Sequence, residues 1–224
     1  MRRDLAETPA FKASRAEQKR GSIRALRAHK RETATVVGLT LGGTIAFYVY
    51  TTYMQKFLKL SAGLSDRQTT SIAAGSLLFA LCLQPLYGAL SDRVGRRPML
   101  IAFGLLGTIF TVPLLTAIQN ARDAWTAFAL ICCAWLIVAL YTSINAVVKA
   151  ELFPTKVRAT GVGVPYAITV SIFGGTAESL ALWFKSIGHE TWFYYYLTGV
   201  IATSLLVYVS MRDTRHHSAM GRHE

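Results

Sequence analysis

Residues 68–91 read QTTSIAAGSLLFALCLQPLYGALS, residues 92–97 read DRVGRR, and residues 98–121 read PMLIAFGLLGTIFTVPLLTAIQNA. Each of the two longer segments contains 24 residues and no charged side chain, whereas the six-residue turn between them contains four. A helix needs roughly 20 mostly apolar residues to cross a hydrocarbon core. The pattern therefore predicts two membrane-spanning helices joined by a short charged turn.

The same pattern recurs along the whole chain of 224 residues. We predict six spans, at residues 33–55, 68–91, 98–121, 124–148, 159–184 and 191–211. Six such runs exclude a soluble globular domain, and they are too long for the roughly ten-residue alternating strands of a membrane β-barrel. The fold class that follows is an all-α membrane protein.

The positive charge is distributed unevenly between the two sides of the predicted membrane domain. An even number of spans places both termini on one side, and that side holds 19 of the 24 lysines and arginines. Cytoplasmic loops are enriched in these residues, so both termini are predicted to be cytoplasmic. Residues 1–32 are then a basic linker and residues 212–224 a tail. The net charge of +12 is explained by this bias and does not indicate nucleic-acid binding.

The charged turn is the most specific local signal. Asp92 can accept hydrogen bonds from a helix N-terminus or pair with Arg96, and Gly95 permits a tight turn. The arginines can anchor the turn on the cytoplasmic side. The residues of this motif are Gly88, Asp92, Arg93, Gly95, Arg96 and Arg97.

This string resembles the signature that the major facilitator superfamily carries between its second and third helices and, in degraded form, between its eighth and ninth. Residues 47–56, 84–92, 150–163 and 172–178 resemble its metabolite:proton symporter branch, and within that branch the α-ketoglutarate permeases most of all. The resemblance implies that the six spans are helices seven to twelve, one half of the fold with a 3+3 inverted repeat. An N-terminal six-helix half would be missing and would be the partner of this half.

The resemblance also implies a function. The family's substrate lies between two six-helix halves that rock against each other. The chain is expected to belong to a proton-coupled symporter of a small carboxylate such as α-ketoglutarate, in the bacterial cytoplasmic membrane, working by alternating access. Citrate, shikimate, proline or betaine are alternative substrates, and a non-transporting interaction protein is the alternative if the half stands alone.

Polar side chains inside the spans are candidates for the substrate cavity. In the first span they recur at three- and four-residue steps, which places them on one face of a helix. Lys149 follows Tyr141 and Asn145 at steps of four, and either anchors the cytoplasmic end, forms a gate or contacts an anionic substrate. The cavity candidates are Thr44, Tyr48, Thr51, Gln55, Gln84, Tyr141 and Asn145.

Three further residues complete the predicted site. Glu178 is the only ionisable residue inside a predicted span. Such residues are costly in hydrocarbon, so proton coupling is one hypothesis, beside an outer gate or an interfacial position. Glu151 and Arg158 are expected to form a cytoplasmic salt-bridge gate with the motif. No histidine lies within a span and no phosphate-binding loop is found, so we expect no enzyme activity, metal or cofactor.

Overall fold

The computed structural model describes residues 29–154 and 157–211, and every regular element in this part of the chain is helical. The predicted linker, apart from residues 29–32, and the predicted tail lie outside the described residues. The elements are α3 (Lys30–Tyr48), η1 (Val49–Tyr53), α4 (Met54–Leu60), α5 (Asp66–Val94), α6 (Arg96–Gln119), α7 (Ala124–Thr142), α8 (Asn145–Glu151), α9 (Arg158–Thr169), η2 (Val170–Gly174), α10 (Ala177–Ser186) and α11 (Glu190–Ser210).

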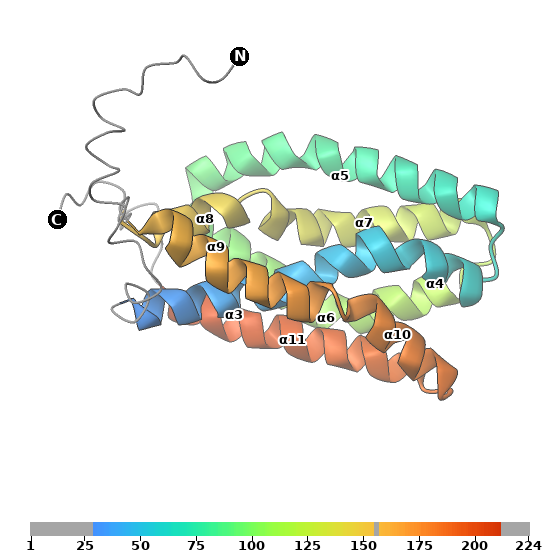
Figure 1. Cartoon of the computed structure of the whole chain (residues 1–224). Coiled ribbons are helices and arrows are strands. Elements are labelled where there is room, and N and C mark those ends of the chain that lie inside the picture. The colour runs from blue at the N-terminus through green and yellow to red at the C-terminus, as the bar shows by residue number, and fades with distance from the viewer. Residues whose placement is uncertain (1–28, 155–156, 212–224) are drawn as a thin grey trace, which may run out of the picture.

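Six helical spans are long and apolar enough to cross a membrane, as the sequence predicts. They lie side by side and alternate in direction, with short connections at both ends (Figure 1). The turn at residues 94–96, the end of α8 at Glu151 and the start of α9 at Arg158 lie at one end, named here the motif end. The turns at residues 60–66, 119–124 and 186–190 lie at the opposite end. The fold is consistent with half of a major facilitator protein.

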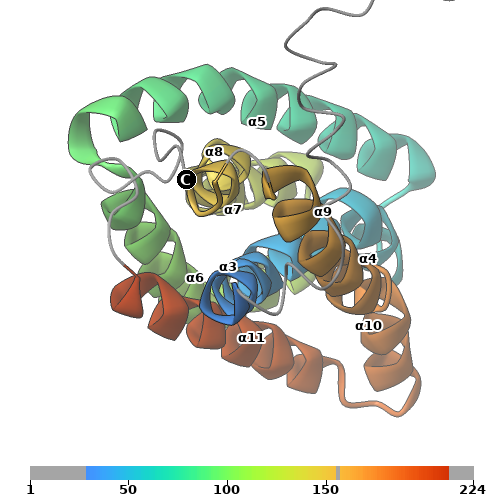
Figure 2. The same ribbon diagram turned by 60° about the vertical axis from the view of Figure 1, so that its left-hand side comes forward.

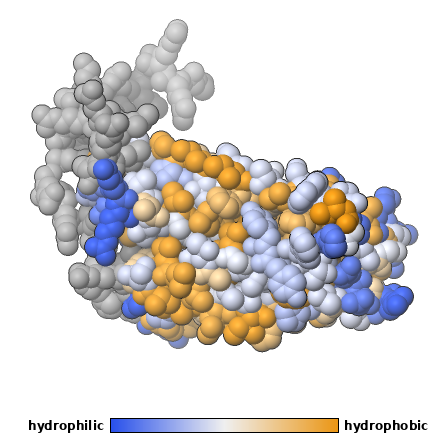
Figure 3. Space-filling view, turned by 90° about the horizontal axis from the view of Figure 1, so that it is seen from below, coloured by the Kyte–Doolittle hydropathy of each residue, from blue (hydrophilic) through white to orange (hydrophobic). Residues whose placement is uncertain are grey.

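The two central spans are α3–η1–α4 and α7–α8, which are more buried than the other four. Figure 2 shows α3 and α7 inside a ring formed by α5, α6, α10 and α11. On the outside, large apolar side chains such as Leu78, Ile109 and Leu206 are exposed. Figure 3 shows hydrophobic residues over the middle of one face and the most hydrophilic residues near its two ends. This distribution suits a hydrocarbon layer around the middle of the bundle.

Local sequence explains where several helices begin. Ser65 caps α5 through a reciprocal capping box with Gln68. Asp123 caps α7 by accepting hydrogen bonds from the Thr126 hydroxyl (2.7 Å) and amide (2.8 Å). These two hydrogen bonds, of which the one from the hydroxyl has the larger effect, hold the pKa of the Asp123 carboxyl below its usual value. Gly95 separates α5 from α6 with a φ of 108°, a conformation that favours glycine.

Small residues let α3 approach α11 closely. The Gly42 amide donates to the Ser204 hydroxyl (2.8 Å), which itself donates to the Gly38 carbonyl (2.7 Å). The buried Tyr208 hydroxyl donates to the Leu39 carbonyl (3.0 Å). A Cβ atom on Gly42 would lie 2.7 Å from the Ile201 Cα, closer than the packing of two backbones allows. The contact therefore depends on glycine at this position.

Three of the spans are not continuous α-helices. The first and the fifth each contain a π-helical turn: η1 lies in the second half of the first span, and η2 lies in the middle of the fifth. In the fourth span, α7 ends at Thr142 and α8 begins at Asn145. Such interruptions in membrane helices are tolerated where the freed backbone groups find other partners, and π-turns are frequent at functional sites.

Candidate functional site

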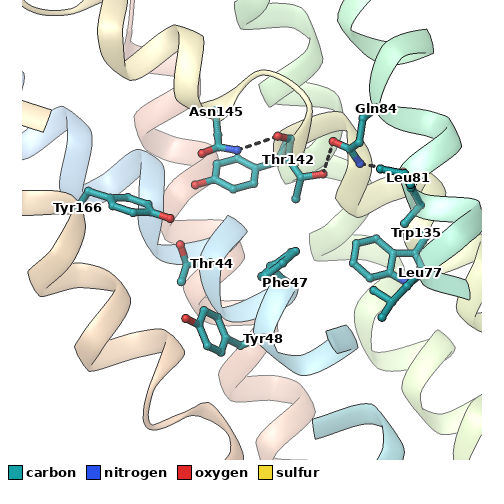
Figure 4. A pocket seen from close by; sticks show the side chains of 12 residues that line it. Thr44, Phe47, Tyr48, Leu77, Leu81, Gln84, Trp135, Thr142, Asn145 and Tyr166 are labelled. Carbon is teal, nitrogen blue, oxygen red and sulfur yellow. Dashed lines mark hydrogen bonds between the residues drawn. The ribbon is translucent and has the colours of Figure 1, made fainter. Parts of the chain in front are cut away.

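A cavity of about 420 Å³ lies between α3, α5, α7, α8 and α9. Figure 4 shows the side chains that line it. Its walls combine hydroxyl and amide groups with aromatic and aliphatic side chains, as expected for a site that orients a small molecule. The lining residues are Thr44, Phe47, Tyr48, Leu77, Ala80, Leu81, Gln84, Trp135, Tyr141, Thr142, Asn145 and Tyr166.

The structure brings five of the seven cavity candidates together in this lining. They come from four different elements, and they are Thr44, Tyr48, Gln84, Tyr141 and Asn145. Thr51 and Gln55 are not part of the lining. Thr51 lies in the π-helical turn, where it donates to the Phe47 carbonyl (2.7 Å), and Gln55 is exposed one turn further on. The wider π-turn ends the three- and four-residue spacing that places the stripe on one face.

A chain of hydrogen bonds crosses the cavity wall from α5 to α8 (Figure 4). The Gln84 amide nitrogen donates to the Ala80 carbonyl (2.9 Å), and the Thr142 hydroxyl donates to the Gln84 amide oxygen (3.2 Å). The Asn145 side chain then donates to the Thr142 carbonyl (2.8 Å), a group that the end of α7 leaves without a helical partner. The helix interruption therefore supplies polar groups to the cavity.

Lys149 lies directly behind this wall, and its side chain is only 2% exposed. Its ammonium donates to the Asn145 amide oxygen (3.1 Å) and the Tyr141 hydroxyl (3.3 Å). It also lies 4.1 Å from the centre of the Tyr166 ring. A lysine that anchors a helix end extends toward water, and this one does not. The steps of four from Tyr141 indicate the shared face, but they do not reveal the burial.

The cavity also contains aromatic residues that the sequence analysis did not select. Phe47 packs edge-to-face on Trp135, with ring centroids 6.2 Å apart, and Tyr166 lines the cavity from α9. Aromatic residues are common in membrane spans. Only their positions around the cavity distinguish Phe47, Trp135 and Tyr166 from the other aromatic residues of the chain.

At the motif end, Arg96 links two turns. Its guanidinium donates to the Asp92 carboxylate (2.7 Å) and the Ser91 carbonyl (3.0 Å), and it lies 3.8 Å from the Glu151 carboxylate. Glu151 and Arg96 are largely buried, whereas the Asp92 side chain is 69% exposed. The α5–α6 turn is thus tied to the end of α8.

The other motif residues have separate positions. Arg97 donates to the carbonyls of Tyr208 (3.4 Å) and Val209 (2.6 Å), which caps the end of α11. Arg158 donates to the Phe153 carbonyl (3.3 Å). Arg93 is exposed, and a Cβ atom on Gly88 would meet no neighbour within 4 Å.

Glu178 lies toward the opposite end, where its carboxylate forms an ion pair with Lys56 across the α4–α10 boundary. A second cavity of about 300 Å³ adjoins it, lined by Tyr48, Thr52, Gly174, Gly175, Glu178 and Ser179. Tyr48 lines both cavities. Glu178 therefore lies beside a cavity that shares one lining residue with the main cavity.

Comparison with known proteins identifies the family. The family described as "Sugar (and other) transporter" matches residues 4–223. The alpha-ketoglutarate permease of Escherichia coli is 46% identical over 92% of this chain and 48% of its own length. The citrate-proton symporter of Klebsiella pneumoniae is 31% identical over 78% of this chain and 40% of its own length. The proline/betaine transporter of Salmonella typhimurium is 26% identical over 99% of this chain and 46% of its own length.

The chain spans about half the length of these curated relatives. No solved structure matches it significantly. The relatives are transporters and not enzymes, and the resemblance to the major facilitator superfamily is confirmed. With its six membrane-crossing helices, the chain is a multi-pass membrane protein that belongs to the sugar (and other) transporter family.

Proposed function

We propose that this chain is the C-terminal half of a proton-coupled secondary transporter for a small carboxylate such as α-ketoglutarate. The observation that carries the proposal is the cavity between α3, α5, α7, α8 and α9, where hydroxyl and amide groups from all five elements meet. A polar cavity among lipid-facing helices is the arrangement expected of a substrate site near the bilayer midplane. The 46% identity to a protein named as an alpha-ketoglutarate permease favours that substrate.

The proposed partner is a second half of six helices, which would close the cavity from the other side. Alternating access would then move this half against its partner around the bound substrate. The charge bias favours a position in the bacterial cytoplasmic membrane with the motif end in the cytoplasm. The contacts of Arg96 with Asp92 and Glu151 would form part of a cytoplasmic gate, because ion pairs that break during rocking separate two discrete states.

For proton coupling we propose Glu178. Its support is the carboxylate's position beside a small cavity that shares Tyr48 with the main one. Protonation of Glu178 would weaken its ion pair with Lys56 and so change the link between α4 and α10.

The test is transport by a complete two-half protein. The chain is joined behind the first half of the Escherichia coli alpha-ketoglutarate permease and produced in cells that lack their own α-ketoglutarate uptake. Uptake of radiolabelled α-ketoglutarate should depend on the pH gradient and be lost on adding a protonophore. An excess of unlabelled citrate, shikimate, proline or betaine should compete poorly.

Strong competition by proline or betaine, with no α-ketoglutarate uptake, would contradict the substrate assignment. The 224-residue chain alone should not accumulate substrate in proteoliposomes, because its cavity would have one wall. Accumulation by the chain alone would contradict the two-half arrangement.

A further inference from the structure

Lys149 is a buried cation whose three neighbours all line the main cavity. We propose that its ammonium binds a carboxylate of the transported substrate at the motif end of that cavity. The inference rests on the proposed transport function, and it adds the group that selects for an anion.

Lys149 has no anionic counterpart among residues 29–154 and 157–211. Its polar contacts there are a tyrosine hydroxyl and an asparagine amide oxygen, both uncharged. Glu151 is the acidic residue nearest in sequence, and its carboxylate lies 3.8 Å from Arg96 and forms no ion pair with the Lys149 ammonium. The second acidic residue near the motif, Asp92, also pairs with Arg96.

A buried ammonium in this state is only partly stabilised. It has three N–H donors, and two of them meet the oxygens of Tyr141 and Asn145. The face of the Tyr166 ring, 4.1 Å away, supplies a cation–π contact, which is weaker than a charge-assisted hydrogen bond. Charged groups inside membrane proteins are normally paired, so an anion of suitable size would stabilise this site.

The cavity gives such an anion a route to the ammonium. Tyr141, Asn145 and Tyr166 form the boundary between the ammonium and the cavity, and Tyr166 is 41% exposed. Rotation of the Tyr166 ring would expose the third N–H group of the Lys149 ammonium to a carboxylate in the cavity. The hydroxyls of Thr44 and Tyr48 lie further along the same cavity and could bind a second polar group of the substrate. The ligand class is thus a small carboxylate with further oxygens.

The experiment uses the two-half protein described above, with α-ketoglutarate as the probe. Lys149→Met keeps the length and apolar character of the side chain and removes the charge. Since it removes an unpaired buried cation, the unliganded protein should melt at the same temperature or higher. The KM for uptake should rise by about ten- to a hundredfold, as expected for loss of a charge-assisted hydrogen bond. Lys149→Arg should retain part of the affinity.

Lys59→Met is the matched control, because Lys59 is an exposed lysine that pairs with Asp66 at the opposite end. It should leave the KM unchanged. In addition, α-ketoglutarate should raise the melting temperature of the wild-type protein and of the control, but not that of Lys149→Met.

An unchanged KM in Lys149→Met would overturn the proposal and leave the proposed function intact. A lower melting temperature with unchanged KM would identify Lys149 as a structural residue and would overturn it equally. If the wild-type protein transports proline or betaine instead, the substrate assignment fails. Lys149 is then tested with that substrate's carboxylate, and the same rise in KM would support the proposal.

Discussion

Replacing Glu151 by glutamine removes a largely buried charge at the motif end and keeps the side-chain shape. The Glu151 carboxylate lies 3.8 Å from the Arg96 guanidinium, and its side chain is only 11% exposed. At an effective dielectric constant of about 20, two unit charges at this distance attract by about 4 kcal/mol. Desolvation offsets part of this attraction, so we expect Glu151→Gln to cost about 2 kcal/mol of stability.

Asp92→Asn is the matched change at the other carboxylate that Arg96 contacts. Its hydrogen bond is shorter, 2.7 Å, but the Asp92 side chain is 69% exposed and screened by water. Exposed ion pairs contribute about 0.5 kcal/mol. Judged by distance alone, the contact of Arg96 with Asp92 would contribute more to stability. Judged by burial, the contact with Glu151 would contribute more.

Thermal unfolding of the purified chain in detergent separates the two rankings. For a domain of this size, 1 kcal/mol corresponds to about 2–4 °C in Tm. We expect a decrease of about 4–8 °C for Glu151→Gln and about 1–2 °C for Asp92→Asn. Equal decreases, or a larger one for Asp92→Asn, would refute the argument that burial decides the strength of the Arg96 contacts.

Three further predictions concern packing, topology and coupling. Gly42→Ala should destabilise the chain by about 1–3 kcal/mol, because its Cβ would lie 2.7 Å from the Ile201 Cα. Gly163→Ala, whose Cβ would meet no neighbour within 4 Å, should not destabilise it. Thermal unfolding of both variants checks this. Single cysteines at Arg67 and Ser218, in a chain without native cysteines, should react oppositely with an impermeant thiol reagent on intact cells, and external labelling of Ser218 would contradict the predicted topology. In the two-half protein, Glu178→Gln should abolish substrate accumulation driven by a pH gradient but retain the exchange of labelled for unlabelled substrate. Accumulation at the wild-type level would show that Glu178 takes no part in proton coupling.

The number of spans follows from the sequence because hydrocarbon imposes a strict length on every uncharged run. The tight turn at Gly95 is similarly evident, since the charges and the glycine are adjacent in the chain. Both features depend on local composition. Four of the five candidates that line the cavity could be found from helical spacing, because Thr44 and Tyr48 precede the π-turn and Tyr141 and Asn145 flank the interruption of the fourth span. Gln84 could be found only as a polar side chain within a span.

The features that the sequence does not reveal depend on where helices deviate from regular geometry. The π-turn at Val49–Tyr53 has no marker residue, and it moves Thr51 and Gln55 off the predicted face. The interruption between Thr142 and Asn145 is equally unmarked. Counting residues from the span's end placed Lys149 at the membrane surface. Its burial results from α9, which brings Tyr166 over the ammonium from a distant part of the chain.

The helices of the bundle differ in how they are held to their neighbours and in how much they contribute to the cavity. α11 packs closely against both α3 and α6. Side chains of one helix bond to the backbone of its neighbour, as Ser204 and Tyr208 do toward α3 and Arg97 does toward α11. Such bonds fix the spacing of the helices to each other. α5 and α9 contribute polar and aromatic side chains to the cavity but are less buried. The cavity therefore combines one helix of this closely bonded group, α3, with the less buried helices α5 and α9.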